Sequence, residues 1–470
     1  MPKPIQLYYD FLSPPSRALW IALKWGQTPF EDCPIALRKF EQLTDEYKKI
    51  NRFQKVPAIV DGNFHLAETV AIVRYLSDKG QFSEQLYPRS VEERARVDEY
   101  LEWQHLNIRV ACSVFFREAW LFPINGLAPM PKPEQIQQLI KDVETNLGLL
   151  EVVWLEKDYL IGDHLTVADL FGATEINQIK LCQYTVNGKQ FPKVAKWLER
   201  VRVAANPYHD EALTFVYKKS KQAASAKLSL DSFSNITYHS IQMSKAIKYY
   251  YDFLSQPSRA LWIGMKLGKT PFDECPVALR KREQLTDEYK KINRFQKVPA
   301  IVDGNFQLAE SVAIVRYLSD KGQFSEQLYP KTLEGRARVD EFLEWQHLSI
   351  RLTCGLFFRS AWLFPVNGIA PMPKAEQIQK MIKDVEANLG LLERLWLEKD
   401  FLIGDQLTVA DIFGASEINQ IKLCQYNVSE KKFPKIAKWL ERVRESANPY
   451  FDEAHSFVYQ KSKQAVSAKV

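Results

Sequence analysis

The chain has 470 residues, of which 46 % are hydrophobic and 26 % are charged, values that are ordinary for a globular protein. The net charge is only +6 and basic residues alternate with acidic ones, which excludes a phosphate-tracking patch, so we expect no nucleic-acid partner. No segment approaches about 18 uninterrupted apolar residues, so the sequence also predicts no membrane span.

A duplication dominates the sequence, because residues 243–470 repeat residues 1–228 with a constant offset of 242 and no gap. Of the 228 aligned positions, 51 differ and the other 177 are identical. Solenoid and propeller repeats recur every roughly 20–50 residues, so this repeat is a duplication of whole domains. Each proposed functional residue can therefore be checked in a second copy.

Up to about residue 85, the first copy alternates short apolar runs with helical patterns. The predicted order is strand 5–9, helix 15–24, strand 30–36, helix 43–51, strand 56–60, strand 64–66 and helix 68–79. Asp61-Gly62 separates the last two strands and is a strong hairpin signal. This order predicts a compact α/β domain.

From residue 90 onward the strand signal disappears, and the pattern predicts helices only. We expect them at 94–116, 133–154, 166–182, 191–205 and 210–222. Thr166 and Asp169 form a variant of the capping box, as do Thr408 and Asp411, so we assign both aspartates to folding.

The domain boundaries follow from these patterns. We expect an α/β domain at 1–82 and an all-α domain at 90–228, repeated at 243–324 and 332–470. The polar, serine-rich stretch 229–242 matches neither repeat and is the expected linker. Its fourteen residues span at most about 50 Å, and the sequence leaves open whether the copies pair with each other or whole chains dimerise.

Cysteine usage points to a reducing compartment. Each copy has three cysteines, none in a C-x-x-C pair, and an odd number cannot pair completely within one copy. Cysteine and histidine lack metal-ligand spacing, so no metal site is expected. The amino terminus has no apolar signal core, so we expect a cytoplasmic protein.

Three sequence runs carry a resemblance to a known family. They are Y-Y-D-F-L-S-x-P-S-R-A, K-V-P-A-I-V-D-G-N-F-x-L-A-E-[TS]-V-A-I-V-R-Y-L and R-A-R-V-D-E-[YF]-L-E-W-Q-H, present in both copies. The chain resembles the cytosolic glutathione transferases, and the theta class in particular, over essentially all of each copy. The resemblance implies a thioredoxin-like glutathione-binding domain followed by a helical domain, twice. It also implies conjugation of the glutathione thiolate to apolar electrophiles, with reduction of organic hydroperoxides within the same chemistry.

Ser13 follows the first predicted strand and opens a helix, and Ser255 is its equivalent. From the residues alone, Ser13 is a helix cap with proline in the first turn. By resemblance, its hydroxyl donates a hydrogen bond to the glutathione sulfur and, with the helix amino terminus, stabilises the thiolate. The two roles are compatible. Phe11 and Phe253 occupy the register of the tyrosine that many related transferases use, which favours the serine type.

The resemblance also implies a glutathione-binding set. The Val56–Pro57 peptide would be cis and pair with the cysteinyl part of glutathione, whereas an ordinary edge proline is the alternative. Glu68 and Thr69 would hold the γ-glutamyl end, and a simple helix cap is the alternative. Lys55 and Gln42 would meet the glycine carboxylate, although Lys55 could be a solvated surface lysine and many theta enzymes have histidine in place of Gln42. The equivalents in the second copy are Val298, Pro299, Glu310, Ser311, Lys297 and Gln284.

Arg109 and its equivalent Arg351 are expected on the first helix of the helical domain, one turn after a histidine. By resemblance this arginine faces the thiolate from the side of the second substrate, and the alternative is a salt-bridge partner. The aromatic residues Trp103, Phe115, Phe116 and Trp120 line the electrophile pocket or belong to the core.

The resemblance implies glutathione as co-substrate, no cofactor, and two-fold dimers as the normal assembly. Two other classes of protein compete with this interpretation. A non-catalytic binding module would be favoured by loss of the Ser13-type or Glu-Thr-type residues in one copy, and neither is lost. A glutaredoxin-like enzyme would need a cysteine near Ser13, and the sequence has none there.

Overall fold

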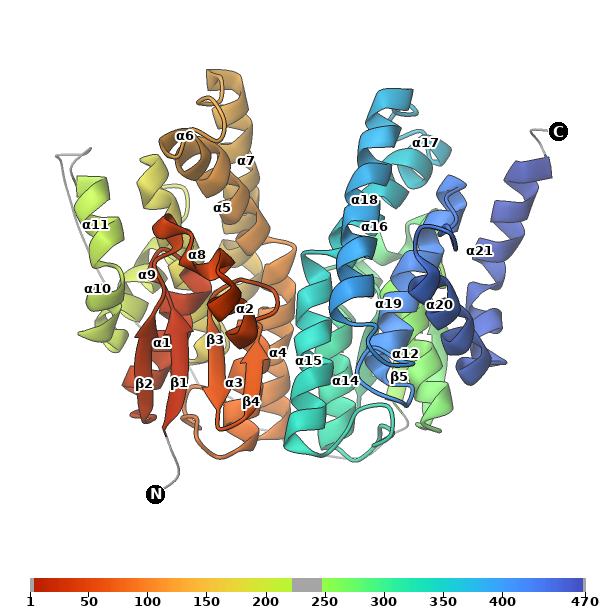
Figure 1. Cartoon of the computed structure of the whole chain (residues 1–470), viewed down its shortest axis with the longest axis horizontal. Coiled ribbons are helices and arrows are strands. Elements are labelled where there is room, and N and C mark those ends of the chain that lie inside the picture. The colour runs from red at the N-terminus through yellow and green to blue at the C-terminus, as the bar shows by residue number, and fades with distance from the viewer. Residues whose placement is uncertain (1–3, 222–246, 468–470) are drawn as a thin grey trace. The chain divides into compact units, whose positions relative to one another are not determined.

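The computed structural model describes residues 4–221 and 247–467 and divides the chain into two compact units, Met1–Ile241 and Gln242–Val470 (Figure 1). Each unit holds one copy of the repeat. The expected linker 229–242 lies outside the described residues. In each unit a thioredoxin-like α/β domain precedes a helical domain, which confirms the predicted fold class.

The α/β domain of unit one is a four-stranded mixed sheet of order β2-β1-β3-β4. Its strands are β1 (Ile5–Tyr9), β2 (Phe30–Pro34), β3 (Ala58–Asp61) and β4 (Phe64–Ala67), and its helices are α1 (Pro14–Trp25), α2 (Asp45–Ile50) and α3 (Thr69–Asp78). β1 runs parallel to β2 and antiparallel to β3, and β3 forms the predicted hairpin with β4. Gly62 has φ 63° in the turn, which glycine adopts without strain.

Unit two repeats this domain with sheet order β6-β5-β7-β8. Its strands are β5 (Ile247–Tyr251), β6 (Phe272–Pro276), β7 (Ala300–Asp303) and β8 (Phe306–Ala309), and its helices are α12 (Gln256–Leu267), α13 (Asp287–Lys290) and α14 (Ser311–Asp320). A pair of short 3-10 turns follows the second strand in each unit: η1 (Leu37–Lys39) and η2 (Glu41–Leu43), then η6 (Leu279–Lys281) and η7 (Glu283–Leu285).

The helical domain contains the remaining elements. In unit one they are α4 (Val91–His105), α5 (Ile108–Phe116), η3 (Arg117–Leu121), α6 (Phe122–Ile124), α7 (Pro133–Leu149), η4 (Leu150–Trp154), α8 (Val167–Gln178), η5 (Ile179–Cys182), α9 (Pro192–Ala205), α10 (Tyr208–Ala212) and α11 (Thr214–Lys221). In unit two they are α15 (Leu333–His347), α16 (Ile350–Phe358), η8 (Arg359–Leu363), α17 (Phe364–Val366), α18 (Ala375–Leu395), α19 (Val409–Gln420), η9 (Ile421–Cys424), α20 (Pro434–Ala447) and α21 (Tyr450–Ser467).

Helix α8 is the centre of unit one, because every one of its residues is buried and α1 packs along it. The capping box at its start is confirmed. Asp169 Oδ2 accepts from the Thr166 amide and hydroxyl at 2.9 Å each, and Asp169 Oδ1 accepts from Trp197 Nε1 at 2.8 Å. These bonds satisfy a buried carboxylate, in agreement with the folding role assigned to it.

The prediction of one helix over 94–116 is wrong. The chain breaks between α4 and α5, and Arg109 therefore lies on the second helix of the helical domain, not on the first. The Asn107 side chain donates to the Trp103 carbonyl at 2.5 Å, and in unit two Ser349 Oγ donates to the Trp345 carbonyl at 2.7 Å. Such side chains compete with the backbone for helix carbonyls and favour a break.

The prediction of one helix over 210–222 is correct only for the equivalent part of unit two. In unit one the helix is interrupted at Leu213, and Gln222 lies outside the described residues. Thr214 Oγ1 donates to the Asp210 carbonyl at 2.8 Å, which is the carbonyl that the helix would use for the Thr214 amide.

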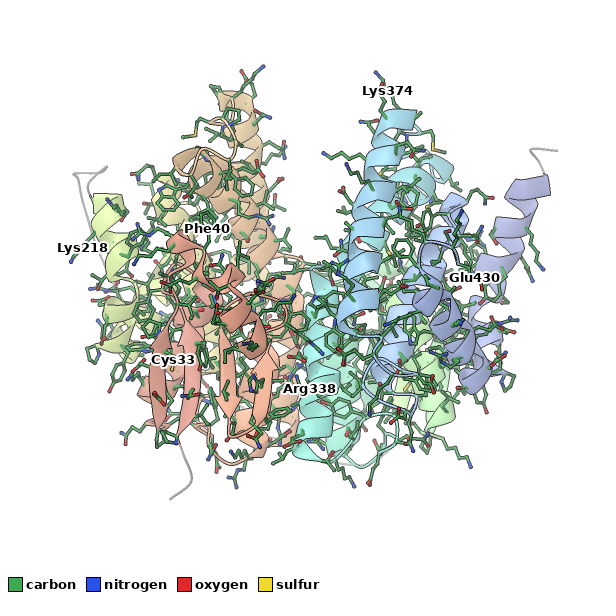
Figure 2. All side chains as sticks on the ribbon, viewed as in Figure 1. Cys33, Phe40, Lys218, Arg338, Lys374 and Glu430 are labelled. Atoms are coloured by element: carbon green, nitrogen blue, oxygen red, sulfur yellow. The ribbon has the colours of Figure 1, made fainter. Side chains whose placement is uncertain are left out.

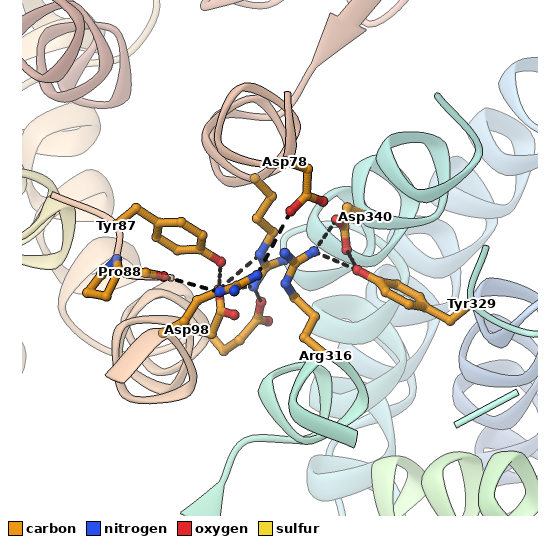
Figure 3. Close-up of polar contacts among 10 residues, drawn as sticks. Asp78, Tyr87, Pro88, Asp98, Arg316, Tyr329 and Asp340 are labelled. Carbon is orange, nitrogen blue, oxygen red and sulfur yellow. Dashed lines mark hydrogen bonds and ion pairs between the residues drawn. The ribbon is translucent and has the colours of Figure 1, made fainter. Parts of the chain in front are cut away.

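A buried polar cluster joins the two domains within each unit (Figure 3). In unit one Arg74 Nη2 on α3 lies 2.9 Å from Asp98 Oδ1 and 2.7 Å from Glu102 Oε1, both on α4. Unit two makes the corresponding contact, 2.6 Å from Arg316 Nη1 to Asp340 Oδ2. Loss of one partner of a buried pair is costly, so the cluster fixes the helical domain on the sheet domain.

All six cysteines are free thiols, including Cys33 on β2 (Figure 2). Burial raises the pKa of Cys182 to about 12 and that of Cys112 well above its usual value, so neither is a ready nucleophile. Among the described helices, none combines the length and the apolar character that crossing a bilayer requires.

Candidate active site

Ser13 is the N-cap of α1, with proline in the first turn, so its capping role is confirmed. Its Oγ accepts from the Ser16 amide at 3.4 Å and donates to the Val56 carbonyl at 3.4 Å. Both distances are long for hydrogen bonds of these types. The hydroxyl is therefore weakly held and can turn its proton toward a better acceptor. Ser255 has the same two contacts in unit two, also at 3.4 Å.

A buried arginine anchors the loop that carries Ser13. Arg17 donates from Nη1 to the Phe11 carbonyl at 2.6 Å and from Nη2 to Gln178 Oε1 at 2.5 Å, and Gln178 Nε2 donates to the Leu12 carbonyl at 3.2 Å. Burial lowers the pKa of Arg17 to about 10. Arg17 and Gln178 were not predicted. The only signal for Arg17 was a cation placed among the apolar residues of a helix.

The Val56–Pro57 peptide is cis, and so is Val298–Pro299, as the resemblance implied. Lys55 has an exposed side chain, so the structure leaves the solvated-lysine alternative open. Its carbonyl accepts from the Tyr47 hydroxyl at 2.7 Å and from Asn51 Nδ2 at 2.6 Å, contacts that hold this loop and were not predicted.

Glu68 and Thr69 begin α3. Glu68 is the N-cap residue with φ 61° and ψ 115°, a conformation that residues other than glycine rarely adopt, and Glu310 repeats it. The Glu68 side chain makes no capping hydrogen bond, so Glu68 is the N-cap residue by position and not through its side chain. In unit two the buried Ser311 hydroxyl has no hydrogen-bond partner among the described residues. Such groups are rare in folded proteins and call for a functional explanation.

Gln42 lies on the short turn η2, and Gln284 on η7. The Oε1 atom of each is buried and has no hydrogen-bond partner within the described part of the chain. The same amide is thus unsatisfied in both copies, as expected of a group that meets a ligand.

Arg109 is a salt-bridge partner, as the alternative held. Its Nε lies 3.6 Å from Glu175 Oε1, and its Nη1 lies 3.2 Å from His105 Nδ1. Burial raises the pKa of the Glu175 carboxyl to about 7, although Arg109 and Arg17 oppose the shift. Arg351 and Glu417 repeat the pair at 3.7 Å. Helix α8 therefore holds both Arg109, through Glu175, and the Ser13 loop, through Gln178.

The four aromatic candidates separate into two groups. Trp103 packs against Tyr100 and Trp154 and belongs to the core, and the buried Phe115 does too. Phe116 and Trp120 stack with ring centroids 5.4 Å apart. Their equivalents in unit two are Phe358 and Trp362. Phe358 forms a buried cluster with Leu254, the residue before Ser255, and Trp362 and Phe457 pack against this cluster.

Within the described ranges no group of three or more histidine, cysteine, aspartate or glutamate side chains is arranged to hold a metal ion.

Comparison with known proteins agrees with this geometry. The N-terminal domain of glutathione S-transferase matches residues 5–78 and 248–320, and the C-terminal domain of the same family matches 119–203 and 358–447. The chain belongs to the glutathione S-transferase family, as two copies in tandem, and its copies are theta-like.

Two curated relatives illustrate the likeness. Glutathione S-transferase theta-1 of Rattus norvegicus is 37 % identical over 217 residues, which is 45 % of this chain and 88 % of the rat protein. The theta-1 enzyme of Homo sapiens is 36 % identical with the same coverage. Among solved structures, human glutathione-S-transferase T1-1 in its apo form is 35 % identical, with a TM-score of 0.43, and covers 46 % of this chain and 91 % of its own.

Proposed function

We propose that each unit is a serine-type glutathione transferase that joins the glutathione thiolate to apolar electrophiles. The observation that carries this proposal is a weakly bonded serine hydroxyl at the start of α1, beside the cis Val56–Pro57 peptide and present in both copies. Membership of the transferase family supplies the reaction class.

In this mechanism the Ser13 hydroxyl turns from the Val56 carbonyl and donates to the glutathione sulfur. A free thiol has a pKa of about 8.5, and the hydrogen bond from the Ser13 hydroxyl together with the α1 amino terminus favours its ionised form. The thiol proton leaves to water. The thiolate then attacks an electrophilic carbon, a carbon–sulfur bond forms, and the leaving group departs with its bonding electrons.

The remaining candidate residues bind the tripeptide. The Val56 backbone pairs with the cysteinyl part, and Thr69 with the α3 amides binds the γ-glutamyl carboxylate while Glu68 meets its ammonium group. Gln42 and Lys55 meet the glycine carboxylate. A carboxylate only accepts hydrogen bonds, so the Gln42 amide donates to it through its nitrogen. Arg109 faces the second substrate.

The same site can reduce an organic hydroperoxide. The thiolate attacks the terminal oxygen, the alcohol leaves, and a second glutathione converts the sulfenic product to the disulfide and water. Glutathione is a co-substrate, and we propose no further cofactor. The pairing partner is the other copy or a second chain, and six free cysteines support a cytoplasmic location.

A glutathione-affinity column followed by a conjugation assay tests the proposal. Retention on the column with turnover of a chloroaromatic or benzylic electrophile is expected. Retention without turnover would favour the second candidate, a non-catalytic binding module, and failure to bind would contradict both.

A further inference from the structure

A pocket of about 760 Å³ lies in unit two beside the loop that leads to Ser255. Its apolar wall is formed by Phe253, Leu254, Val277 and Phe457. Leu254 directly precedes Ser255, and Phe457 comes from the terminal helix α21. An electrophile that meets a thiolate at Ser255 would occupy this space under the proposed function.

The two carboxylates of this pocket are used by backbone amides. Asp252 accepts from the Leu254 amide at 2.7 Å and from the Leu279 amide at 3.0 Å. Glu283 accepts from the Ala278 amide at 2.6 Å. These hydrogen bonds engage the carboxylate oxygens and hold the loop between β6 and η7.

The two cations of the same pocket, Arg280 and Lys281, are not held in this way. The Arg280 guanidinium lies 5.0 Å from the centroid of the Phe457 ring, a cation–π contact that holds it at the pocket rim. Neither Arg280 nor Lys281 makes an ion pair with any residue in 4–221 or 247–467. The pocket therefore combines apolar walls with two cations at its rim, Arg280 and Lys281, that are free to meet a ligand, whereas the oxygens of its two carboxylates are engaged by backbone amides.

Unit one repeats the charged and aromatic contacts of this arrangement. Arg38 lies 5.1 Å from the Phe215 centroid, Asp10 accepts from the Leu12 and Leu37 amides, and Glu41 accepts from the Ala36 amide. Lys39 is the equivalent of Lys281. The arrangement is thus retained between copies that differ at 51 positions.

We propose that this rim selects electrophiles that carry a carboxylate or sulfonate at the end away from the reacting carbon. The inference rests on the proposed transferase function and names its substrate class. A planar guanidinium presents two parallel N–H donors to such a group, and the contact with the phenylalanine ring reduces the freedom lost on binding. Lysine adds a second, less directional charge.

Unit two should show the stronger selection. Arg282 stands there at the position of Phe40 in unit one, whose side chain is 53 % exposed (Figure 2). Unit two thus has three consecutive cations after β6, and unit one has two.

The test compares two electrophiles that differ in charge, 4-nitrobenzyl chloride and 4-(chloromethyl)benzoate, both of which lose chloride to the thiolate. The variant is Arg38→Gln with Arg280→Gln in the full chain. Its control is Lys141→Gln with Lys383→Gln, which removes the same charge from exposed sites on α7 and α18. We measure the ratio of kcat/KM for the benzoate to kcat/KM for the neutral compound.

The ratio should fall about tenfold in the variant Arg38→Gln with Arg280→Gln, and it should stay within twofold of the wild-type value in the lysine control. In Arg38→Lys with Arg280→Lys, which keeps the charge, the ratio should fall about threefold. An unchanged ratio in Arg38→Gln with Arg280→Gln overturns the inference, even if kcat/KM falls equally for both electrophiles. If the wild type turns over neither compound, the transferase function itself fails, an outcome distinct from turnover without charge selection.

Discussion

The two units agree around the candidate glutathione site and differ at their terminal helices. Ser13 and Ser255 have the same contacts at the same distances. In unit one the terminal helix is interrupted at Leu213, whereas α21 is continuous. The copies have therefore diverged at the terminal helix, while the hydrogen bonds of Ser13 and Ser255 have stayed the same.

The divergence under the helix concerns packing and not charge. In unit two His455 stacks on Phe451 with centroids 4.2 Å apart, and in unit one the equivalent pair is Leu213 and His209. Burial lowers the pKa of His209 to about 4 and that of His455 well below its usual value, so both rings are neutral at pH 7. The terminal helix of each unit buries a neutral imidazole, from a different position on that helix.

The largest expected effect is a loss of stability in one unit that leaves the other unit unchanged. Arg17→Met leaves the Phe11 carbonyl and Gln178 without their buried partner, which costs about 3 kcal/mol. Calorimetry should show the transition of unit one falling by roughly 10 °C while that of unit two stays. Arg259→Met should produce the reverse pattern. A variant that moves both transitions, or neither, would contradict the anchoring role.

A second effect concerns pH and should be equal in the two units. The folded pKa of Glu175 is raised to about 7 from an ordinary 4.5, so the folded state holds this proton more tightly than the unfolded chain. Stability therefore falls as the pH rises between these values, by about 3 kcal/mol for one such group. Glu175→Gln with Glu417→Gln should remove most of that slope.

Denaturant midpoints at pH 5 and pH 8 provide the measurement for this pair. The control is Glu156→Gln with Glu398→Gln, which changes two exposed carboxylates. A slope that survives in the Glu175 variant would show that other groups cause it.

The smallest expected effect probes the divergent helix directly. Leu213→His alone buries an imidazole without the aromatic partner of unit two and should cost about 2 kcal/mol. Adding His209→Phe restores the unit-two pair and should recover about 1 kcal/mol. Equilibrium unfolding of the two variants and of His209→Phe completes the cycle, and additive costs would mean that the pair does not act together.

Local signals predicted much of the fold. The hairpin at Asp61-Gly62, the helix cap at Ser13 and the box of Thr166 and Asp169 each depend on a few neighbouring residues, and all are confirmed. The break at Asn107 was missed because the apolar periodicity continues through it, and only a side-chain bond to Trp103 creates it.

The residues that hold the candidate site in place could not be predicted from the sequence, for a different reason. Arg17 meets Gln178 across 161 positions, and Glu175 meets Arg109 from another helix. No local pattern reports such pairings. The first exists only after the sheet domain and the helical domain have packed, and the second only after α5 and α8 have packed within the helical domain. The resemblance supplied the residues that would touch glutathione, and the structure added those that hold them.

The account depends on the serine hydroxyls, and ionisation of bound glutathione tests them most directly. The ultraviolet absorbance of the thiolate, titrated on the full chain, should give a thiol pKa clearly below the free value of about 8.5. With Ser13→Ala and Ser255→Ala together, that pKa should return to near the free value and turnover should fall about 100-fold. Unchanged ionisation and unchanged turnover in this double variant would contradict the serine mechanism.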